Sequence, residues 1–249
     1  MQVEHEIPVD GKTVSAVHHE AASDGDQWLV FCHGFRSDKT GSYETRCERA
    51  VEEGYHAVRF DFRGSGESDG AFADATLTTR IDDLLAVVER FDPPSYALFG
   101  SSFGAKVAFH AAARAGRPSG IGEPVVIVAR APVTYNRAFD EYREIIDSEG
   151  VLRYDADHAI DRRFFDDFDG YAFADVVDAL DLPVALFHGS DDESVPIADT
   201  FEAAAALDAD VLVAKYAGEG HRFSRAGEKR LRAQTFGWLS TVWPAAGPD

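Results

Sequence analysis

Short, continuously apolar runs alternate with helical patterns along most of this sequence. Six such runs can be read: WLVFCHGF, HAVRFDFRG, SYALFG, PVVIVA, PVALFHG and DVLVAKY. Helical patterns lie between or after them, at about 42–53, 77–91, 103–115, 197–206 and 224–242. Strands that are apolar throughout belong to parallel sheets whose two faces are both covered by helices. The alternation therefore predicts an α/β fold.

The start of the chain departs from this order. Two alternating runs, VEHEIPV and TVSAVHHE, are separated by DGK and predict a β-hairpin. A hairpin is antiparallel, so it adds an antiparallel edge to the sheet. We expect a mostly parallel eight-stranded sheet with this N-terminal edge and with helices on both faces.

The alternation stops between Pro132 and Leu182, where no clean strand occurs but aromatic residues are frequent. These are Tyr135, Phe139, Tyr142, Tyr154, Phe164, Phe165, Phe168, Tyr171 and Phe173. A long insertion between two strands usually serves function. We expect a single domain, 1–249, with a small, mostly helical cap at about 133–181. Most of the aromatic side chains should pack the cap onto the core, and two or three should line an acyl or aromatic pocket.

The sequence GSSFG, at 100–104, joins an apolar strand to an alanine-rich helix. Gly100, Ser102 and Gly104 form G-x-S-x-G, which places a serine in a tight strand-to-helix turn. The glycines are needed because a side chain two residues to either side would clash with neighbouring backbone. The helix directs its N-terminal N–H groups at the site, which favours developing negative charge. Ser102 is the candidate nucleophile; the alternative is a turn that only lets the helix pack closely.

A serine hydroxyl needs an adjacent base to react near neutral pH. His221, in a glycine-flanked loop after the last strand, is the candidate base. A carboxylate must fix the tautomer of that histidine and stabilise its charged form. Asp191 and Asp192, at the end of the run that begins PVALFHG, are both candidates, and the spacing from His188 and Gly189 favours Asp192.

Five motifs together resemble the α/β-hydrolase superfamily. They are FCHGF at 31–35, DFRGSGES at 61–68, GSSFG at 100–104, HGSDDESVP at 188–196 and GEGHRF at 218–223. Their order along the chain, with serine before aspartate before histidine, is that of this superfamily. Within it, the sequence looks most like small capped serine esterases of the feruloyl or cinnamoyl type. The resemblance implies cleavage of a carboxylic ester through an acyl-enzyme, with Ser102, Asp192 and His221 as the catalytic triad.

The same resemblance implies an oxyanion hole made by the backbone N–H groups of Phe35 and Phe103. It implies structural roles for His33 and His188. Two other functions are compatible with these motifs: an acyl thioesterase that uses the same triad, and a non-catalytic binding protein on the same scaffold. Binding proteins of this kind normally lack a triad residue, and this sequence retains all three.

Composition restricts the expected partners. Acidic residues outnumber basic ones 44 to 24, giving a formal net charge of −20, and they are spread along the chain. Phosphate binding needs basic clusters, so nucleic acid and anionic membranes are not expected as partners. The expected partner is a small-molecule ester, and the sequence does not predict an oligomeric state. The two cysteines, Cys32 and Cys47, do not show the spacing of metal ligands, and the histidines do not show it either. We therefore expect no metal and no cofactor.

The location and the working conditions can also be predicted. No run of about 18 apolar residues occurs, and the N-terminus lacks the basic-then-apolar order of a secretory signal, so we expect a cytoplasmic protein. Many aspartates, and arginine favoured over lysine, are typical of proteins from salt-loving organisms. We therefore hypothesise that molar salt stabilises the fold; the alternative is an acidic surface that only aids solubility.

Overall fold

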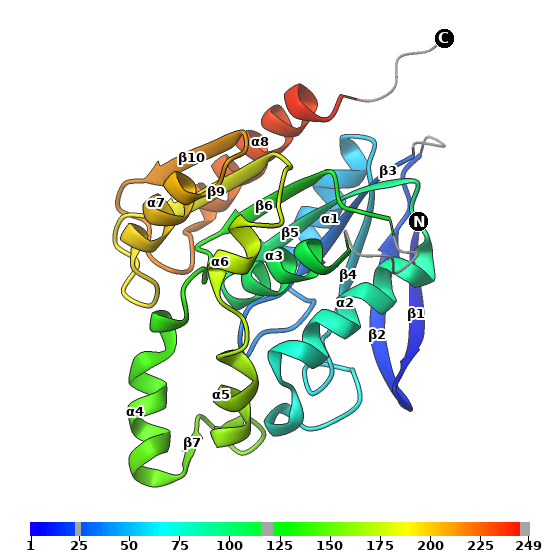
Figure 1. The fold of residues 1–249 in the computed structure, drawn as a ribbon. Coiled ribbons are helices and arrows are strands. Elements are labelled where there is room, and N and C mark those ends of the chain that lie inside the picture. Colours follow the sequence, from blue (N-terminus) through cyan, green and yellow to red (C-terminus); the bar gives the residue numbers. More distant parts are fainter. Residues whose placement is uncertain (23–25, 116–121, 245–249) are drawn as a thin grey trace.

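The computed structural model describes residues 1–22, 26–115 and 122–244, and an eight-stranded sheet runs through it (Figure 1). The strand order is β1-β2-β4-β3-β5-β6-β9-β10. The strands are β1 (Gln2–Val9), β2 (Lys12–His19), β3 (Gln27–Cys32), β4 (His56–Phe60), β5 (Ser95–Ser101), β6 (Val126–Arg130), β9 (Val184–Gly189) and β10 (Val211–Tyr216). Only the β1–β2 and β2–β4 pairings are antiparallel within this sheet, which confirms the predicted fold class and its N-terminal edge.

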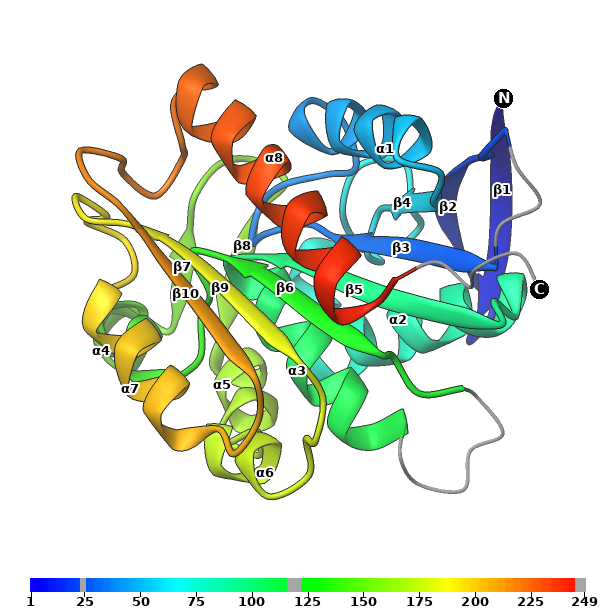
Figure 2. The ribbon, with the colours of Figure 1, turned by 90° about the horizontal axis from the view of Figure 1, so that it is seen from above.

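Helices cover both faces of the sheet (Figure 2). On one face lie α1 (Ser42–Glu52) and α8 (Arg225–Val242), and on the other lie α2 (Leu77–Phe91), α3 (Phe103–Ala115) and α7 (Ile197–Ala206). Each face buries its own apolar core, because the strands present hydrophobic side chains in both directions. The predicted bounds of α2, α3 and α7 match the structure. Helix α8 begins one residue later than expected because Ser224 is its N-cap, accepting a hydrogen bond from the Gly227 N–H.

The chain between β6 and β9, residues 131–183, is called the insertion below. It contains the helices α4 (Asp140–Glu149), α5 (Arg162–Phe168) and α6 (Phe173–Val177), after the 3₁₀ turn η2 (Asn136–Phe139). Two antiparallel strands, β7 (Val151–Arg153) and β8 (Ala159–Asp161), lie between α4 and α5. The prediction of no strand in this region is wrong at β7 and β8. Strands of three residues show too little alternation to be recognised in a sequence.

Most aromatic side chains of the insertion pack inward. Phe139, Phe164, Phe165, Phe168 and Phe173 are all buried within the larger apolar core. Their rings meet those of core residues; for example, the Phe103 and Phe168 ring centroids lie 6.0 Å apart. This is the packing expected for most of them.

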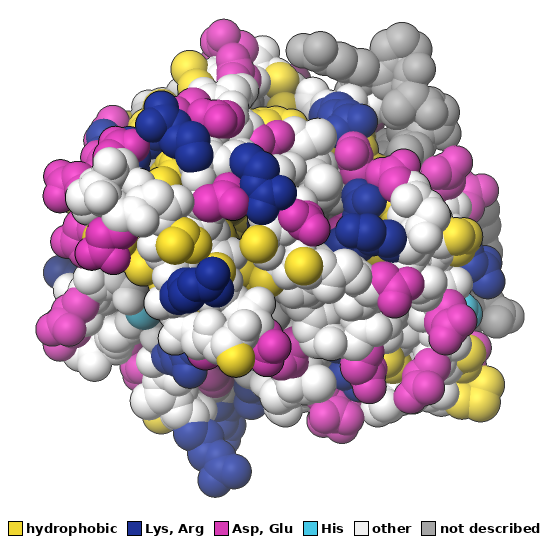
Figure 3. Space-filling model, turned by 90° about the horizontal axis from the view of Figure 1, so that it is seen from below, with side chains coloured by type: hydrophobic (Ala, Val, Ile, Leu, Met, Phe, Trp, Pro, Cys, Tyr) yellow, Lys and Arg dark blue, Asp and Glu magenta, His cyan; other side chains and the backbone are white. Residues whose placement is uncertain are grey.

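The surface reflects the acidic composition. On the face drawn in Figure 3, acidic side chains are spread widely, with basic side chains and small hydrophobic areas between them. Among the residues that the structure describes, no helix combines the length and the apolar character needed to cross a membrane.

The sheet topology determines where the site can form. Parallel strands bring their carboxyl ends to one edge, where ligands of open α/β sheets bind. β5 lies between β3 and β6, so the loop after β3 and the end of β6 both adjoin the turn that follows β5. The loops after β9 and β10 reach the same edge from the far side of the sheet.

Candidate active site

Ser102 stands at the turn between β5 and α3. Its φ is +53°, in the left-handed region that a residue with a side chain rarely adopts. Hydrogen bonds hold this conformation: the Ser102 N–H donates to the Arg130 carbonyl at 2.8 Å, and its own carbonyl accepts from the Ala105 N–H at 3.0 Å and the Val133 N–H at 3.1 Å. The strained backbone is thus fixed by β6, by α3 and by the start of the insertion, as expected at a functional turn.

The two glycines of the turn are required by close packing. A Cβ on Gly100 would lie 2.4 Å from the Ala105 Cα, and one on Gly104 would lie 2.3 Å from the Cys32 carbonyl oxygen. Both distances are far inside van der Waals contact. The glycines therefore let α3 approach the ends of β5 and β3, and this approach makes the tight turn possible.

The structure brings together the three side chains named from the sequence. His221 Nε2 lies 3.0 Å from the Ser102 Oγ, and His221 Nδ1 lies 2.8 Å from the Asp192 Oδ2. These contacts join loops after β5, β9 and β10, which are separated by 119 and 29 residues along the chain. The arrangement forms a continuous path for a proton between the hydroxyl and the imidazole.

Asp192, and not Asp191, contacts the histidine. The Asp192 side chain is fully buried, and its Oδ1 accepts the N–H groups of Ser194 at 2.8 Å and Val195 at 2.9 Å. The exposed Asp191 carboxylate instead accepts a hydrogen bond from the Ser190 hydroxyl at 2.6 Å. Neighbouring aspartates thus have different surroundings, because only one of them turns inward.

His188 supports Asp192 from the buried side. Its Nε2 lies 3.0 Å from the Asp192 Oδ2, while its Nδ1 lies 2.6 Å from the Thr200 Oγ1. Burial raises the pKa of Asp192, but hydrogen bonds from His188, His221 and the Val195 amide outweigh that effect and hold its pKa well below the usual range. The carboxylate is therefore ionised at neutral pH and can stabilise a positive charge on His221.

The loop after β3 lies against the serine turn. His33 is buried, its Nε2 accepts the Phe62 N–H at 3.1 Å, and its Nδ1 donates to the Gly34 carbonyl at 2.9 Å. Burial lowers the pKa of His33 to about 4, so the imidazole is neutral and fixes the loop instead of exchanging protons. Phe35 follows directly, with its ring centroid 5.4 Å from that of Phe103.

Phe103 is the first residue of α3, so its N–H is among those with no partner within the helix.

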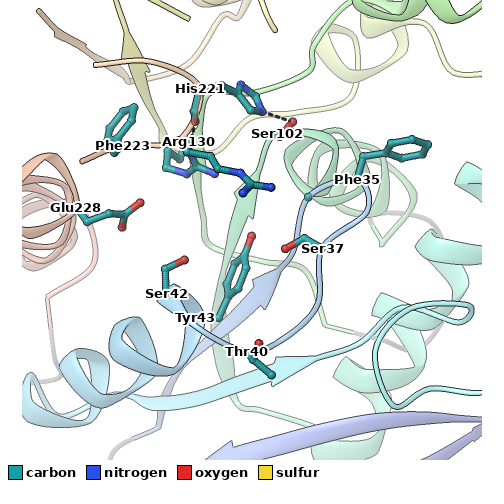
Figure 4. A pocket seen from close by; sticks show the side chains of 12 residues that line it. Phe35, Ser37, Thr40, Ser42, Tyr43, Ser102, Arg130, His221, Phe223 and Glu228 are labelled. Atoms are coloured by element: carbon teal, nitrogen blue, oxygen red, sulfur yellow. Dashed lines mark hydrogen bonds between the residues drawn. The ribbon is translucent and has the colours of Figure 1, made fainter. Parts of the chain in front are cut away.

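Two cavities meet at Ser102 and His221. The first, of about 400 Å³, lies under the insertion and is here called the insertion cavity; Val133, Ala138, Phe139, Tyr142 and Val195 line it together with the polar residues Arg36 and Ser194. The second, of about 380 Å³, lies toward α1 and α8 and is called the polar cavity (Figure 4); Ser37, Thr40, Ser42, Tyr43, Arg130 and Glu228 line it. Phe35 and Arg222 line both cavities. Phe139 and Tyr142 are thus insertion aromatics that face a cavity.

Sequence reasoning did not find the residues of the polar cavity. Arg130 is the last residue of β6 and directly follows the run PVVIVA. The residues on either side of it form no recognisable motif. Tyr43 and Ser42 belong to the start of α1, where they fit an ordinary helix pattern. The one available signal was position, since Arg130 follows a parallel strand at the edge where sites form.

The two cysteines lie in the interior of the structure. Cys32 and Cys47 are buried, and burial raises the pKa of both thiols well above the usual range. No group of three or more His, Cys, Asp or Glu side chains within 1–22, 26–115 and 122–244 could hold a metal ion.

Comparisons with known proteins find similar hydrolases. Residues 24–134 match the family described as serine aminopeptidase, S33. The mitochondrial palmitoyl-protein thioesterase ABHD10 of Pongo abelii is 24% identical over 226 residues, covering 83% of this chain and 71% of that protein. Protein ABHD12B of Homo sapiens is 30% identical over 203 residues, covering 76% of this chain and 52% of that protein.

Solved structures show the same fold. Est1E from Butyrivibrio proteoclasticus, solved with ferulic acid bound, superposes with a TM-score of 0.82 at 20% identity, covering 96% of this chain and 99% of its own. Mouse alpha/beta hydrolase domain-containing protein 10 has a TM-score of 0.80 at 20% identity, with coverage of 96% and 99%. These structures show that the chain has the fold of the α/β hydrolases.

Proposed function

We propose that the protein is a serine hydrolase that cleaves a small-molecule carboxylic ester through an acyl-enzyme intermediate. The observation that carries this proposal is the hydrogen-bonded line from Ser102 through His221 to the buried Asp192, at the junction of two cavities. Acyl transfer requires a nucleophile, a base and a group that orients the base, and these side chains have those properties.

Acylation begins at the serine hydroxyl. His221 Nε2 takes the proton as the Ser102 Oγ forms a bond to the ester carbonyl carbon. The tetrahedral intermediate then collapses, the bond to the alcohol oxygen breaks, and His221 returns the proton to that oxygen. Asp192 stabilises the charged imidazole in between. The alcohol leaves, and the acyl group stays on Ser102.

Deacylation repeats the sequence with water. His221 takes a proton from water as its oxygen attacks the acyl carbon, and the bond to the Ser102 Oγ breaks as that oxygen regains a proton. The products are the carboxylic acid and the free enzyme. Each step needs only groups of this chain and water.

The backbone N–H groups of Phe35 and Phe103 are proposed as the oxyanion hole. Phe103 supports this role because it begins α3, where free N–H groups and the helix dipole favour negative charge. Phe35 supports it because its loop packs against the serine turn and lines both cavities. Loss of one such donor typically costs about 3 kcal/mol in the barrier.

The insertion cavity is proposed to take the acyl group. The part of its lining formed by Val133, Phe139, Tyr142 and Val195 suits an aromatic or short aliphatic acyl chain. Ferulic acid, an aromatic acid, is bound to Est1E in the similar structure, which agrees with an aromatic acyl group.

Thioester hydrolysis is the second candidate function. It is favoured by the sequence similarity to palmitoyl-protein thioesterase ABHD10 over 83% of this chain. The same three side chains would cleave a thioester, since only the leaving atom differs. The ratio of kcat/KM for a 4-nitrophenyl ester and a coenzyme A thioester of the same acyl group separates the two functions.

Replacement of the nucleophile tests the proposal. We expect Ser102→Ala to abolish 4-nitrophenyl ester hydrolysis while its circular dichroism spectrum and melting temperature stay close to wild type. Ser148→Ala is the matched control, because this exposed serine in α4 only donates to the Ile145 carbonyl. Undiminished turnover by purified Ser102→Ala would refute the mechanism.

A non-catalytic binding protein would behave differently with a covalent probe. We expect a fluorophosphonate probe to label the wild-type protein and not Ser102→Ala. Absence of labelling in a folded wild-type protein would favour the binding-protein alternative.

A further inference from the structure

Arg130 carries a buried positive charge beside the nucleophile. The residue is 8% exposed and stands at the end of β6, one strand away from Ser102. In the described part of the chain, no carboxylate forms an ion pair with it. The neighbouring Arg46 differs, because it holds the Glu228 carboxylate through two hydrogen bonds of 2.8 and 2.9 Å. A buried guanidinium without a carboxylate partner is costly and calls for an explanation.

The hydrogen bonds of Arg130 leave part of its guanidinium free for a ligand. One Nη1 hydrogen goes to the His221 carbonyl, and the Nε hydrogen points to the Ser101 Oγ at 3.4 Å. A guanidinium has five N–H donors. The outer end of the group points into the polar cavity, toward the side where Ser37 and Tyr43 also direct their hydroxyl groups (Figure 4).

The charge around the cavities is opposite to that of the whole chain. The formal net charge is −20, yet Arg36, Arg130 and Arg222 line the two cavities, against the single carboxylate of Glu228. That carboxylate is already engaged by Arg46. Local positive charge in a cleft attracts an anion even when the net charge of the protein is negative.

We propose that the polar cavity binds a carboxylate group carried on the alcohol part of the ester substrate. This inference rests on the proposed function, in which the insertion cavity holds the acyl group. The alcohol must then occupy the other cavity, beside the His221 imidazole that protonates it as it leaves. Arg130 donates to the backbone of that same histidine, so a substituent on the leaving alcohol falls within its reach.

The chemistry of the cavity favours a carboxylate over a phosphate. The planar guanidinium matches the two oxygens of a carboxylate, and hydroxyl groups of Ser37, Ser42 and Tyr43 can donate further hydrogen bonds. Glu228 lines the same cavity, so a dianionic phosphate would meet more repulsion than a carboxylate. Burial and the nearby Arg46 both lower the pKa of Arg130, and a bound carboxylate opposes this effect.

Two esters with the same acyl group test the proposal. We compare 3-(butanoyloxy)benzoate with 3-(butanoyloxy)benzamide, which differ in charge but little in shape. Each kcat/KM is divided by the rate of alkaline hydrolysis of the same ester, to remove intrinsic reactivity. We expect the wild-type protein to prefer the benzoate by about 10- to 100-fold, the range for a hydrogen-bonded charge pair. Equal values for the two esters would overturn the proposal.

Variants then assign the preference to Arg130. We expect Arg130→Gln to lose the preference while its turnover of the benzamide ester falls less. Arg225→Gln is the control, because it removes the same charge from an exposed position at the start of α8 and should keep the preference. A preference that persists in Arg130→Gln would overturn the proposal, since the carboxylate would then be recognised elsewhere.

A measurement on the wild-type protein covers the case in which Arg130→Gln does not fold. We expect 3-hydroxybenzoate to inhibit hydrolysis of a neutral ester competitively, at least 10-fold more strongly than 3-hydroxybenzamide. Equal inhibition constants would overturn the proposal.

Turnover of the neutral ester separates this proposal from the proposed function. If turnover depends on Ser102 but shows no charge preference, only the carboxylate site fails. If turnover does not depend on Ser102, the proposed function fails.

Discussion

One buried carboxylate organises the histidine side of the site. Asp192 accepts hydrogen bonds from two histidines and two backbone amides, and no part of its side chain is exposed. Its lowered pKa keeps it charged in the folded protein at neutral pH. In the proposed mechanism, this residue holds the His221 ring and stabilises its charged form.

Substitution of the two adjacent aspartates tests that role. We expect Asp192→Asn to lower kcat for a 4-nitrophenyl ester by about 10³- to 10⁴-fold, because the amide favours the wrong imidazole tautomer. Asp191→Asn changes the same group one residue earlier, on the surface, and should leave kcat within about 2-fold of wild type. A larger loss of kcat in Asp191→Asn than in Asp192→Asn would mean that Asp191 is the carboxylate that orients His221.

At the level of the elements, helix α3 carries the serine turn and also supports the insertion. Its first turn is packed so closely against β3 that Gly104 has no room for a Cβ. At the end of the same turn, Lys106 is buried and donates to the Thr134 carbonyl at 3.4 Å, the Asn136 Oδ1 at 2.8 Å and the Tyr171 carbonyl at 2.8 Å. The same helix thus positions Ser102 and holds residues of the insertion.

The packing of α3 predicts a loss of stability. Gly104→Ala should lower the free energy of unfolding by about 1–3 kcal/mol, because a Cβ there overlaps the Cys32 and His33 carbonyl oxygens. Gly237→Ala is the matched control, since a Cβ at that helical position meets nothing within 4 Å and should stabilise α8 by up to about 1 kcal/mol. Denaturant unfolding of both variants measures the difference, and an unchanged Gly104→Ala midpoint would contradict the packing argument.

Lys106 predicts how stability depends on pH. Burial lowers its pKa in the folded protein to about 7, whereas an unfolded lysine titrates near 10.4. Between these values the unfolded chain binds more protons, so raising the pH favours folding. The free energy of unfolding should rise by about 2 kcal/mol from pH 7 to pH 9 in the wild-type protein, relative to Lys106→Met. Parallel pH curves for the two proteins, measured by denaturant unfolding, would show that the ammonium stays charged.

At the scale of the whole molecule, charge is the dominant feature. The formal net charge is −20, and acidic side chains are spread over the face drawn in Figure 3. Self-repulsion at that level destabilises a compact state. Salt screens such repulsion: the Debye length falls from about 10 Å at 0.1 M to about 3 Å at 1 M. We infer that this protein is adapted to high salt.

The melting temperature tests this inference. It should rise by several degrees between 0.1 and 3 M KCl. The rise should be smaller in a variant with Glu141, Glu144 and Glu149 replaced by Gln, because these exposed residues form no ion pair within the described chain. A melting temperature that stays flat or falls with salt would count against the adaptation.

The sequence predicted the elements well because each carries its own local pattern. The strands of the main sheet and helices α2, α3 and α7 could be read from apolar runs and periodicity. Strands β7 and β8 could not, since pairs of three residues gain their stability from the surrounding packing. The strand order depends on contacts between distant segments, and the sequence analysis did not predict it.

Only part of the candidate site could be predicted from the sequence. Ser102, Asp192 and His221 each lie in a short motif, so they could be named, and the structure then brings their side chains together. Arg130 and Tyr43 lie in ordinary strand and helix patterns, and only the folded chain directs them into one cavity. Residues that line a binding cavity only through the fold belong to no local sequence motif, so the sequence alone does not identify them.

Direct detection of the acyl-enzyme tests the central claim most closely. Wild-type protein is mixed with excess 4-nitrophenyl butanoate, quenched in acid within the first turnovers, digested and analysed by mass spectrometry. We predict a butanoyl adduct on the peptide that contains Ser102, with a matching burst of 4-nitrophenol, and neither signal in Ser102→Ala. Hydrolysis with the adduct on a different residue, or equal hydrolysis by Ser102→Ala, would contradict the account.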